Sequence, residues 1–407
     1  MKKTIISIVC LVTAQMVYSD DIIVTVDFDS TVSIAEQLCC EWPTVDSLVM
    51  LGGPIDSKDM EPIVDFIHTK KVRGVDASKA TFVGDELPEL AFWPLGPHAA
   101  LRYITLPSTL KRMGVHCLYQ APITELVIPE GVTELAWAAM FQCKQLRRLQ
   151  LPTTLTIIGD NALSELECLE ELQLPFGLET IGTEALYGLG KTVTEVLVPS
   201  TVTTIGPMAF FMCKGLRRVA LPAPLTDIND DTFHGCDSLQ QVEWPAALRT
   251  IGVRAFRGCG FRQLRLPEGV SDLGAYAFAV NPRLEEVVLP ASLQRLCATS
   301  FVWCDSITSM TCRAEVPPTV ENDALESHIV PPASATLYVP AESVEAYRSA
   351  SYWASFVRIE PIQASIVQTT TVSLDHGGRI YNLNGVSTPT PPLRGLHIRN
   401  GRKVLVR

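Results

Sequence analysis

A motif of about 23 residues recurs from the low hundreds of this chain to beyond residue 300. One copy is the stretch Ala209 to Pro222, and each copy closes with a branched or aromatic residue followed by proline. The closing prolines are Pro107, Pro129, Pro152, Pro175, Pro199, Pro222, Pro245, Pro267 and Pro290. A second marker, a Met, Leu or Phe, keeps the same spacing at Met140, Leu163, Leu186, Phe210, Phe233, Phe256, Phe278 and Phe301. This period predicts a solenoid, in which each unit buries its apolar face only against its neighbours.

The order of residues within a copy predicts its local structure. Leu216, Val219 and Leu221 are the inward positions of a short strand, and Pro222 ends that strand because it lacks a backbone donor. An Ile-Gly or Leu-Gly pair follows in most copies, and we expect its glycine to take a positive φ angle before one helical turn. These pairs are Ile158-Gly159, Ile181-Gly182, Ile205-Gly206, Ile251-Gly252 and Leu273-Gly274. The Ala-Phe pairs behind them predict a ladder of stacked phenylalanines through the core.

The predicted fold class is therefore an α/β solenoid of about ten repeats, with a parallel β-sheet and short helical or 3-10 turns. Five segments are expected: a signal peptide (1–19), an N-terminal cap (20–95), the repeat array (96–312), a C-terminal cap (313–362) and a small β-rich module (363–407). The first segment has a charged start, a short apolar run and small Ser19 at the cleavage position, so we expect export.

The caps and the tail show their own patterns. The N-terminal cap predicts strands at Ile22–Val26, Val45–Leu51 and Val72–Val75 and a helix at Asp59–His68. In the C-terminal cap, the stretch Val339–Tyr347 predicts a strand end and a helix, Trp353 and Phe356 are apolar plugs, and Phe356–Ile362 predicts a closing strand. Asn400-Gly401, between alternating apolar residues, predicts a hairpin with a two-residue turn.

The chain has 12 cysteines, and their positions matter more than their number. Five of them follow the second marker by three residues: Cys143, Cys213, Cys236, Cys259 and Cys304. Leu166, Leu189 and Asn281 hold that position in other copies, which indicates a buried slot for a free thiol rather than a disulfide. Cys39 and Cys40 could pair with Cys117 or with each other, and the sequence does not decide between these pairings.

Catalysis, metal binding and cofactor binding find no support in the motifs. The seven histidines share no repeat position, no Cys-x-x-Cys occurs, and no nucleophile, zinc or phosphate-loop motif is present. The net charge of −11 argues against nucleic acid and anionic lipid as partners. We therefore expect a protein that is not an enzyme and holds no cofactor.

A striped row of polar residues is the candidate binding surface. These residues stand between the inward anchors of successive strands, which lie about 4.8 Å apart in a parallel sheet. They are Arg147, Arg148, Glu170, Glu171, Glu195, Arg217, Arg218, Gln241, Arg262, Gln263, Glu285 and Glu286. One interpretation is cross-strand charge pairing that keeps the sheet soluble. The other is a docking face for a protein partner, in which arginine is a common anchor.

The pattern Leu-x-x-Val-x-Leu-Pro-x-x-Leu-x-x-Ile-Gly-x-x-Ala-Phe-x-x-Cys resembles the BspA-like leucine-rich repeat family of bacterial surface proteins, over roughly residues 101–312. This resemblance implies a leucine-rich-repeat solenoid, displayed at the cell surface and acting by adhesion or ligand binding. The tail from residue 363 is similar to the β-rich sorting domains of type IX secretion cargo, which implies that secretion machinery as a partner.

The leading hypothesis for function is an exported protein, at the cell surface or extracellular, that binds an extracellular or host protein through the sheet face. The alternative is a structural component of the cell envelope that associates with itself or binds the cell wall and has no host ligand. No segment is long and apolar enough to span a bilayer, so surface attachment would use other means.

Overall fold

The computed structural model describes residues 22–31, 33–39, 44–93, 100–321, 335–362, 395–399 and 402–406. The chain divides into two compact units, residues 1–360 and 361–407, which are described separately below. The predicted signal peptide and Cys40 lie outside the described residues, and the five segment limits stay predictions.

The first unit begins with the predicted strand–helix–strand arrangement. Helix α2 (Ser57–Thr69) begins at a capping box, in which the Asp56 side chain accepts hydrogen bonds from the N–H groups of Lys58 and Asp59. Its buried side chains recur at helical spacing and are Met60, Ile63, Val64, Phe66 and Ile67. A short helix, α1 (Ile34–Gln37), precedes it. The helix and the first two cap strands predicted from the sequence are thus confirmed, whereas the third strand begins at Gly74 and runs on to Phe82, well beyond the predicted Val72–Val75.

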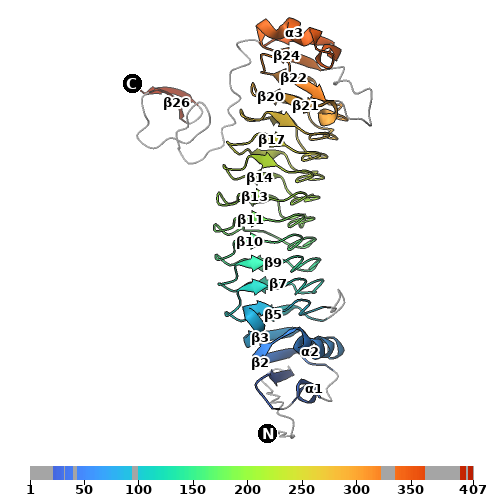
Figure 1. Cartoon of the computed structure of the whole chain (residues 1–407), viewed down its shortest axis with the longest axis vertical. Coiled ribbons are helices and arrows are strands. Elements are labelled where there is room, and N and C mark those ends of the chain that lie inside the picture. Colours follow the sequence, from blue (N-terminus) through green and yellow to red (C-terminus); the bar gives the residue numbers. More distant parts are fainter. Residues whose placement is uncertain are drawn as a thin grey trace. The chain divides into compact units, whose positions relative to one another are not determined.

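The longer strands of this unit follow one another in one column (Figure 1). Within each sheet, the neighbouring strands up to β24 pair in parallel. They are β1 (Ile23–Asp27), β2 (Ser47–Ile55), β3 (Gly74–Phe82), β5 (Tyr103–Thr105), β7 (Glu125–Val127), β9 (Arg148–Gln150), β12 (Glu195–Leu197), β14 (Arg218–Ala220), β16 (Gln241–Glu243), β18 (Gln263–Arg265), β20 (Glu286–Leu289), β22 (Ser309–Cys312), β24 (Thr336–Val339) and β25 (Arg358–Pro361). Between β9 and β12 one copy forms no strand, yet the Glu170 N–H still donates to the Arg147 carbonyl at 3.0 Å. We call the outward side of β5 to β20 the long-strand face.

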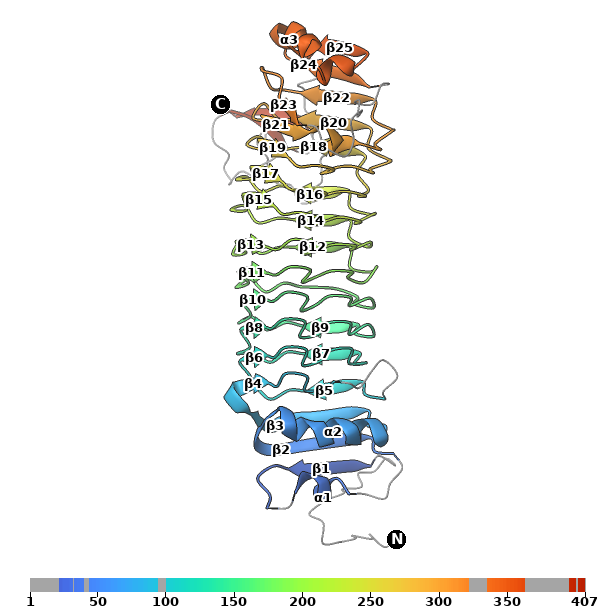
Figure 2. The same ribbon diagram turned by 45° about the vertical axis from the view of Figure 1, so that its right-hand side comes forward.

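A second column of shorter parallel strands lies beside the first (Figure 2). They are β4 (Glu86–Leu87), β6 (Arg112–Met113), β8 (Glu134–Leu135), β10 (Ile157–Ile158), β11 (Thr180–Ile181), β13 (Thr204–Ile205), β15 (Asp227–Ile228), β17 (Thr250–Ile251), β19 (Asp272–Leu273), β21 (Arg295–Cys297) and β23 (Thr319–Glu321). Each coil of the array therefore contributes one strand to this column, and all but the copy between β9 and β12 contribute one to the first column.

Hydrogen-bonded turns lead from each short strand to the next long strand, and we call this part of the surface the turn side. Alternate N–H groups donate to the next coil, as Phe210 does to the Thr232 carbonyl at 2.9 Å. The N–H groups between them donate three residues back, as Phe211 does to Met208. In most copies the predicted helical turn is therefore a series of hydrogen-bonded turns and not a helix. The reason is that every second backbone N–H group in this segment bonds to a neighbouring coil and not within its own coil. The 3-10 segments are η1 (Val83–Asp85), η2 (Ala298–Phe301), η3 (Ala341–Ser343) and η4 (Trp353–Ser355).

The prediction that the Ile-Gly glycines take positive φ angles is wrong. The positive angle falls two residues later, at 56° for Asn161 in the copy that contains Gly159. Gly159 instead donates its N–H to the Leu135 carbonyl of the preceding coil at 2.8 Å. A Cβ atom on Gly159 would lie 2.7 Å from that oxygen, so glycine is required for close approach of the two coils.

The predicted phenylalanine ladder is confirmed. The rings of Phe210, Phe233, Phe256, Phe278 and Phe301 are buried and stacked, with successive centroids 5.1, 5.1, 5.3 and 5.6 Å apart. Each ring comes from the same position of its own coil, so the coil spacing sets the ring spacing.

The five repeat cysteines are buried and free, as predicted. Each thiol donates to the carbonyl of the marker residue one coil earlier, as Cys236 does to Phe210 at 3.1 Å. Asn281 occupies the same slot and donates from its amide to the Phe256 carbonyl at 3.0 Å. Burial raises the pKa of the Cys143 thiol to about 12, so this thiol stays protonated at neutral pH. Cys39 and Cys117 are also unpaired.

The C-terminal cap closes the first unit with the predicted elements. Helix α3 (Val344–Ser349) follows β24, and the side chains of Trp353 and Phe356 are buried. The Trp353 indole donates to the Pro318 carbonyl at 3.0 Å, and the Tyr347 hydroxyl donates to the Ala314 carbonyl at 2.8 Å. These hydrogen bonds tie the cap to the last coil.

The second unit contains the predicted hairpin. Strands β26 (Gly395–Arg399) and β27 (Arg402–Val406) are antiparallel, with Arg399 opposite Arg402. Asn400 and Gly401, the predicted turn residues, lie outside the described residues.

Replacing one rung of the ladder tests the core. Phe256→Ala should lower the free energy of unfolding by about 3–5 kcal/mol, because it leaves a cavity between two stacked rings. Chemical denaturation followed by circular dichroism measures this change. Phe176→Ala is the matched control, since Phe176 is 76% exposed and its loss should cost less than about 0.5 kcal/mol. Equal losses in the two variants would contradict the ladder's role.

A second substitution tests the contact between coils. Gly159→Ala should lower the free energy of unfolding by about 1–3 kcal/mol, because its methyl group would meet the Leu135 carbonyl. In Gly177→Ala the new Cβ would lie 3.5 Å from the nearest atom, the Thr153 carbonyl oxygen, so this control should be neutral or slightly stabilising. Thermal unfolding of both variants separates the effects, and a neutral Gly159→Ala would refute the close-approach account.

Candidate binding surfaces

Six residues of the predicted binding surface lie in the long strands: Arg148, Glu195, Arg218, Gln241, Gln263 and Glu286. The other six lie just before a long strand or in the copy that forms none: Arg147, Glu170, Glu171, Arg217, Arg262 and Glu285. Parallel register places Glu195 beside Arg218, Arg218 beside Gln241, and Gln263 beside Glu286. None of the twelve is buried, and only Arg218 and Glu286 are half-buried. All twelve side chains are thus open to solvent.

Ion pairs between neighbouring strands neutralise part of this face. Arg148 Nη1 lies 3.0 Å from Glu125 Oε1, and Arg147 Nη1 lies 3.8 Å from Glu170 Oε1. All four side chains are largely exposed, so each pair contributes no more than about 1 kcal/mol to stability. For Arg147, Arg148 and Glu170 the interpretation as cross-strand pairing is therefore well supported.

Arg218 has two carboxylate partners. Its guanidinium bonds to Glu195 on the preceding strand and to Glu243 on the following strand. The hydrogen bond to Glu243 is the main reason that the pKa of Arg218 is raised. On the next strands, Arg265 Nη2 lies 2.8 Å from Glu286 Oε1.

Three of these partners, Glu125, Glu243 and Arg265, were missed by the sequence analysis. Glu243 and Arg265 follow the inward residue of their strand, and continued alternation of inward and outward residues could have indicated them.

Arg217 and Arg262 differ from their neighbours. In the described part of the chain, no ion pair or side-chain hydrogen bond engages either guanidinium. Val127 and Leu197 are more than half exposed on the same face.

An aromatic cleft on the turn side was also missed. It has a volume of about 450 Å3 and lies where the end of the N-terminal cap meets the first repeats. Trp93 comes from the cap, whereas His116, Tyr119, Trp137 and Phe141 come from two successive coils. The available indication was an aromatic residue directly after the marker position, as at Phe141. Trp93 carries the same indication, because it directly follows the buried pair Ala91-Phe92, which matches Ala209-Phe210.

A polar network occupies the middle of the turn side. Asp231 is buried, and Arg254 donates to both of its carboxylate oxygens at 2.9 and 2.8 Å. His234 Nδ1 lies 2.8 Å from Asp231 Oδ1, and Arg257 Nη1 lies 2.9 Å from His234 Nε2. Both ring nitrogens of His234 thus have a polar partner.

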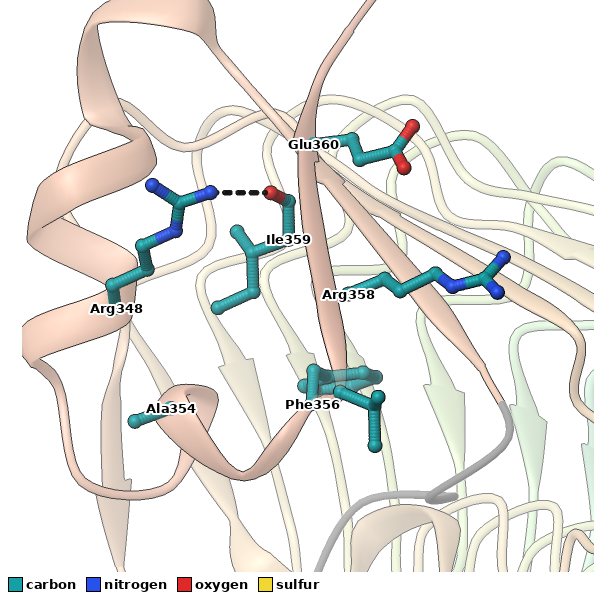
Figure 3. A pocket seen from close by; sticks show the side chains of 7 residues that line it. Arg348, Ala354, Phe356, Arg358, Ile359 and Glu360 are labelled. Carbon is teal, nitrogen blue, oxygen red and sulfur yellow. Dashed lines mark hydrogen bonds between the residues drawn. The ribbon is translucent and has the colours of Figure 1, made fainter.

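A second pocket, of about 320 Å3, lies in the C-terminal cap (Figure 3). Arg348, Phe356, Arg358 and Glu360 are among its lining residues. Arg348 is already engaged, since it donates to the Ile359 carbonyl at 3.3 Å and pairs with Glu345 at 2.6 Å. Arg348 therefore helps to satisfy the backbone of the last strand.

No group of three or more His, Cys, Asp or Glu side chains among the described residues is arranged to hold a metal ion. Within the same residues, no helix has the length and apolar character needed to cross a membrane.

Comparison with known proteins identifies the family. The profile described as "BspA type Leucine rich repeat region" matches six copies, over residues 97–217 and 203–328. These matches span more than half of the chain, so the protein belongs to the BspA-type leucine-rich repeat family. The fold class expected from the resemblance, a leucine-rich-repeat solenoid, is thereby confirmed. Comparison with curated protein sequences gives no match.

Solved structures of similar fold come from several bacteria. A leucine-rich repeat protein from Bacteroides ovatus is 22% identical, with a TM-score of 0.45, and the match covers 62% of this chain and 67% of that one. The pneumococcal vaccine antigen PcpA is 14% identical, with a TM-score of 0.43 and coverage of 79% and 80%. A leucine rich cell surface protein from Faecalibacterium prausnitzii is 17% identical, with a TM-score of 0.30 and coverage of 66% and 79%.

Proposed function

We propose that this protein is exported and binds a protein partner of the extracellular or host-matrix type through its long-strand face. The observation that carries the proposal is the pair of exposed arginines, Arg217 and Arg262, that the ion-pair network leaves without a carboxylate among the described residues. Arginine is over-represented among the residues that dominate binding energy at protein interfaces. Exposed Leu197 adds apolar area on the same face.

Pairing distinguishes the residues that stabilise this face from those that are free to bind. Arg148 and Arg218 would have to give up a carboxylate before engaging a partner, and this exchange reduces the net gain. Arg217 and Arg262 have no such cost. Export rests on the signal-like first 19 residues, and the sorting role of residues 363–407, with type IX machinery as partner, stays a prediction.

Binding to fibronectin, fibrinogen, laminin and collagen, measured by biolayer interferometry, tests the proposal. In the Arg217→Ser/Arg262→Ser variant, affinity for any protein that binds should fall at least about tenfold. Arg249→Ser is the matched control, because Arg249 directly precedes short strand β17 as Arg217 precedes β14. This control should bind like the unmodified chain.

Two results would overturn the proposal. If the double variant binds as tightly as the unmodified chain, the long-strand face is not the binding surface. If no protein of the panel binds and sedimentation shows concentration-dependent assembly, the self-associating envelope component is the better account.

A further inference from the structure

The aromatic cleft on the turn side is formed by residues that take no part in the long-strand face. Its volume of about 450 Å3 is within the range of small-molecule sites, roughly 300–1,000 Å3. The side chains that matter are Trp93, His116, Tyr119, Trp137, Phe141 and Asn161, which line it together.

The rings of the two coils are fixed against one another. Tyr119 and Phe141 are stacked, with centroids 5.7 Å apart and planes 6° from parallel. The His116 ring lies 4.4 Å from Trp137 and 5.1 Å from Tyr119. Trp93 and Trp137 nevertheless remain 45% and 52% exposed, so two large indole surfaces face solvent at the cleft. Exposed aromatic surface of this kind marks an interaction site.

The charge of the lining selects against ions. None of the lining side chains carries a formal charge at neutral pH. Burial lowers the pKa of His116, and the nearby Glu89 carboxylate only partly offsets this effect, so the imidazole stays neutral. A charged ligand would lose hydration here without gaining an ionic partner among the lining residues.

The free polar groups of the cleft select against a purely apolar ligand. Within the described residues, no side-chain hydrogen bond occupies the Asn161 amide, the Tyr119 hydroxyl or the indole N–H of Trp137. An aliphatic side chain seated in the cleft would separate these groups from water without replacing their hydrogen bonds. The matching ligand has a flat face of C–H groups and a rim of hydroxyls.

We propose that the cleft binds a neutral carbohydrate. The C–H face of a pyranose ring, which carries partial positive charge, lies on the electron-rich face of Trp137 or Trp93. Ring hydroxyls exchange hydrogen bonds with the Asn161 amide and the Tyr119 hydroxyl. This ligand class and this side of the solenoid both differ from those of the protein partner proposed above.

Titration of the full chain with cellotriose, chitotriose and maltotriose, followed by tryptophan fluorescence and calorimetry, tests the inference. At least one trisaccharide should bind with a Kd in the millimolar range or below. Trp137→Ala should weaken that binding at least about tenfold, and Tyr119→Phe, which removes only a hydroxyl, about threefold to tenfold. Circular dichroism confirms that each variant is folded.

The matched control is Trp303→Ala. Trp303 is 51% exposed and lies in a later coil, where it stacks on Tyr276 with centroids 6.2 Å apart. This variant should bind the sugar unchanged, and a loss equal to that of Trp137→Ala would overturn the site. The inference is also overturned if none of the three sugars binds. Two amino-acid derivatives, N-acetyl-lysine amide and N-acetyl-leucine amide, probe the alternative that the cleft binds a peptide side chain. If one of them binds in a Trp137-dependent way and no sugar does, the proposed ligand class is wrong.

Discussion

Contact between successive coils is the constraint on which the rest of this structure depends. On the turn side, Met208, Phe210 and Met212 donate their N–H groups to carbonyls of the next coil at 3.0, 2.9 and 2.8 Å. Because buried backbone donors must be satisfied, these bonds fix the coil spacing. The core side chains then have to match that spacing, and the phenylalanine ladder does so. The coil spacing also requires glycine at position 159, because a Cβ atom on Gly159 would push two coils apart.

The same constraint explains how much could be predicted from the sequence. Phe233 and Phe256 are one repeat apart in the sequence, so they occupy the same position in successive coils. The ladder and the thiol slot behind it could therefore be predicted from the repeat period. The role of Gly159 did not follow, because a glycine needed for a turn and a glycine needed for close approach look alike in a sequence. Only the position of the neighbouring carbonyl decides between them.

The candidate surfaces divide in a similar way. The alternation of inward and outward residues predicted which side chains would lie on the long-strand face. It did not predict that Arg218 would have two carboxylate partners while Arg217 has none among the described residues, because pairing depends on strand register and side-chain reach. The aromatic cleft combines Trp93 of the N-terminal cap with Trp137 of the array. Trp93 follows a buried Ala-Phe pair as Phe211 does, but that pair lies before the regular array, where the period of about 23 residues is interrupted.

Amide hydrogen exchange over the turn side tests the central claim most directly. Segment 207–213 contains neither helix nor strand, and a loop of that kind ordinarily exchanges quickly. If its donors bond to the neighbouring coil, the amides of Met208, Phe210 and Met212 should exchange as slowly as those of strand β14. Exchange at the rate of an unprotected loop, while β14 remains protected, would contradict the account.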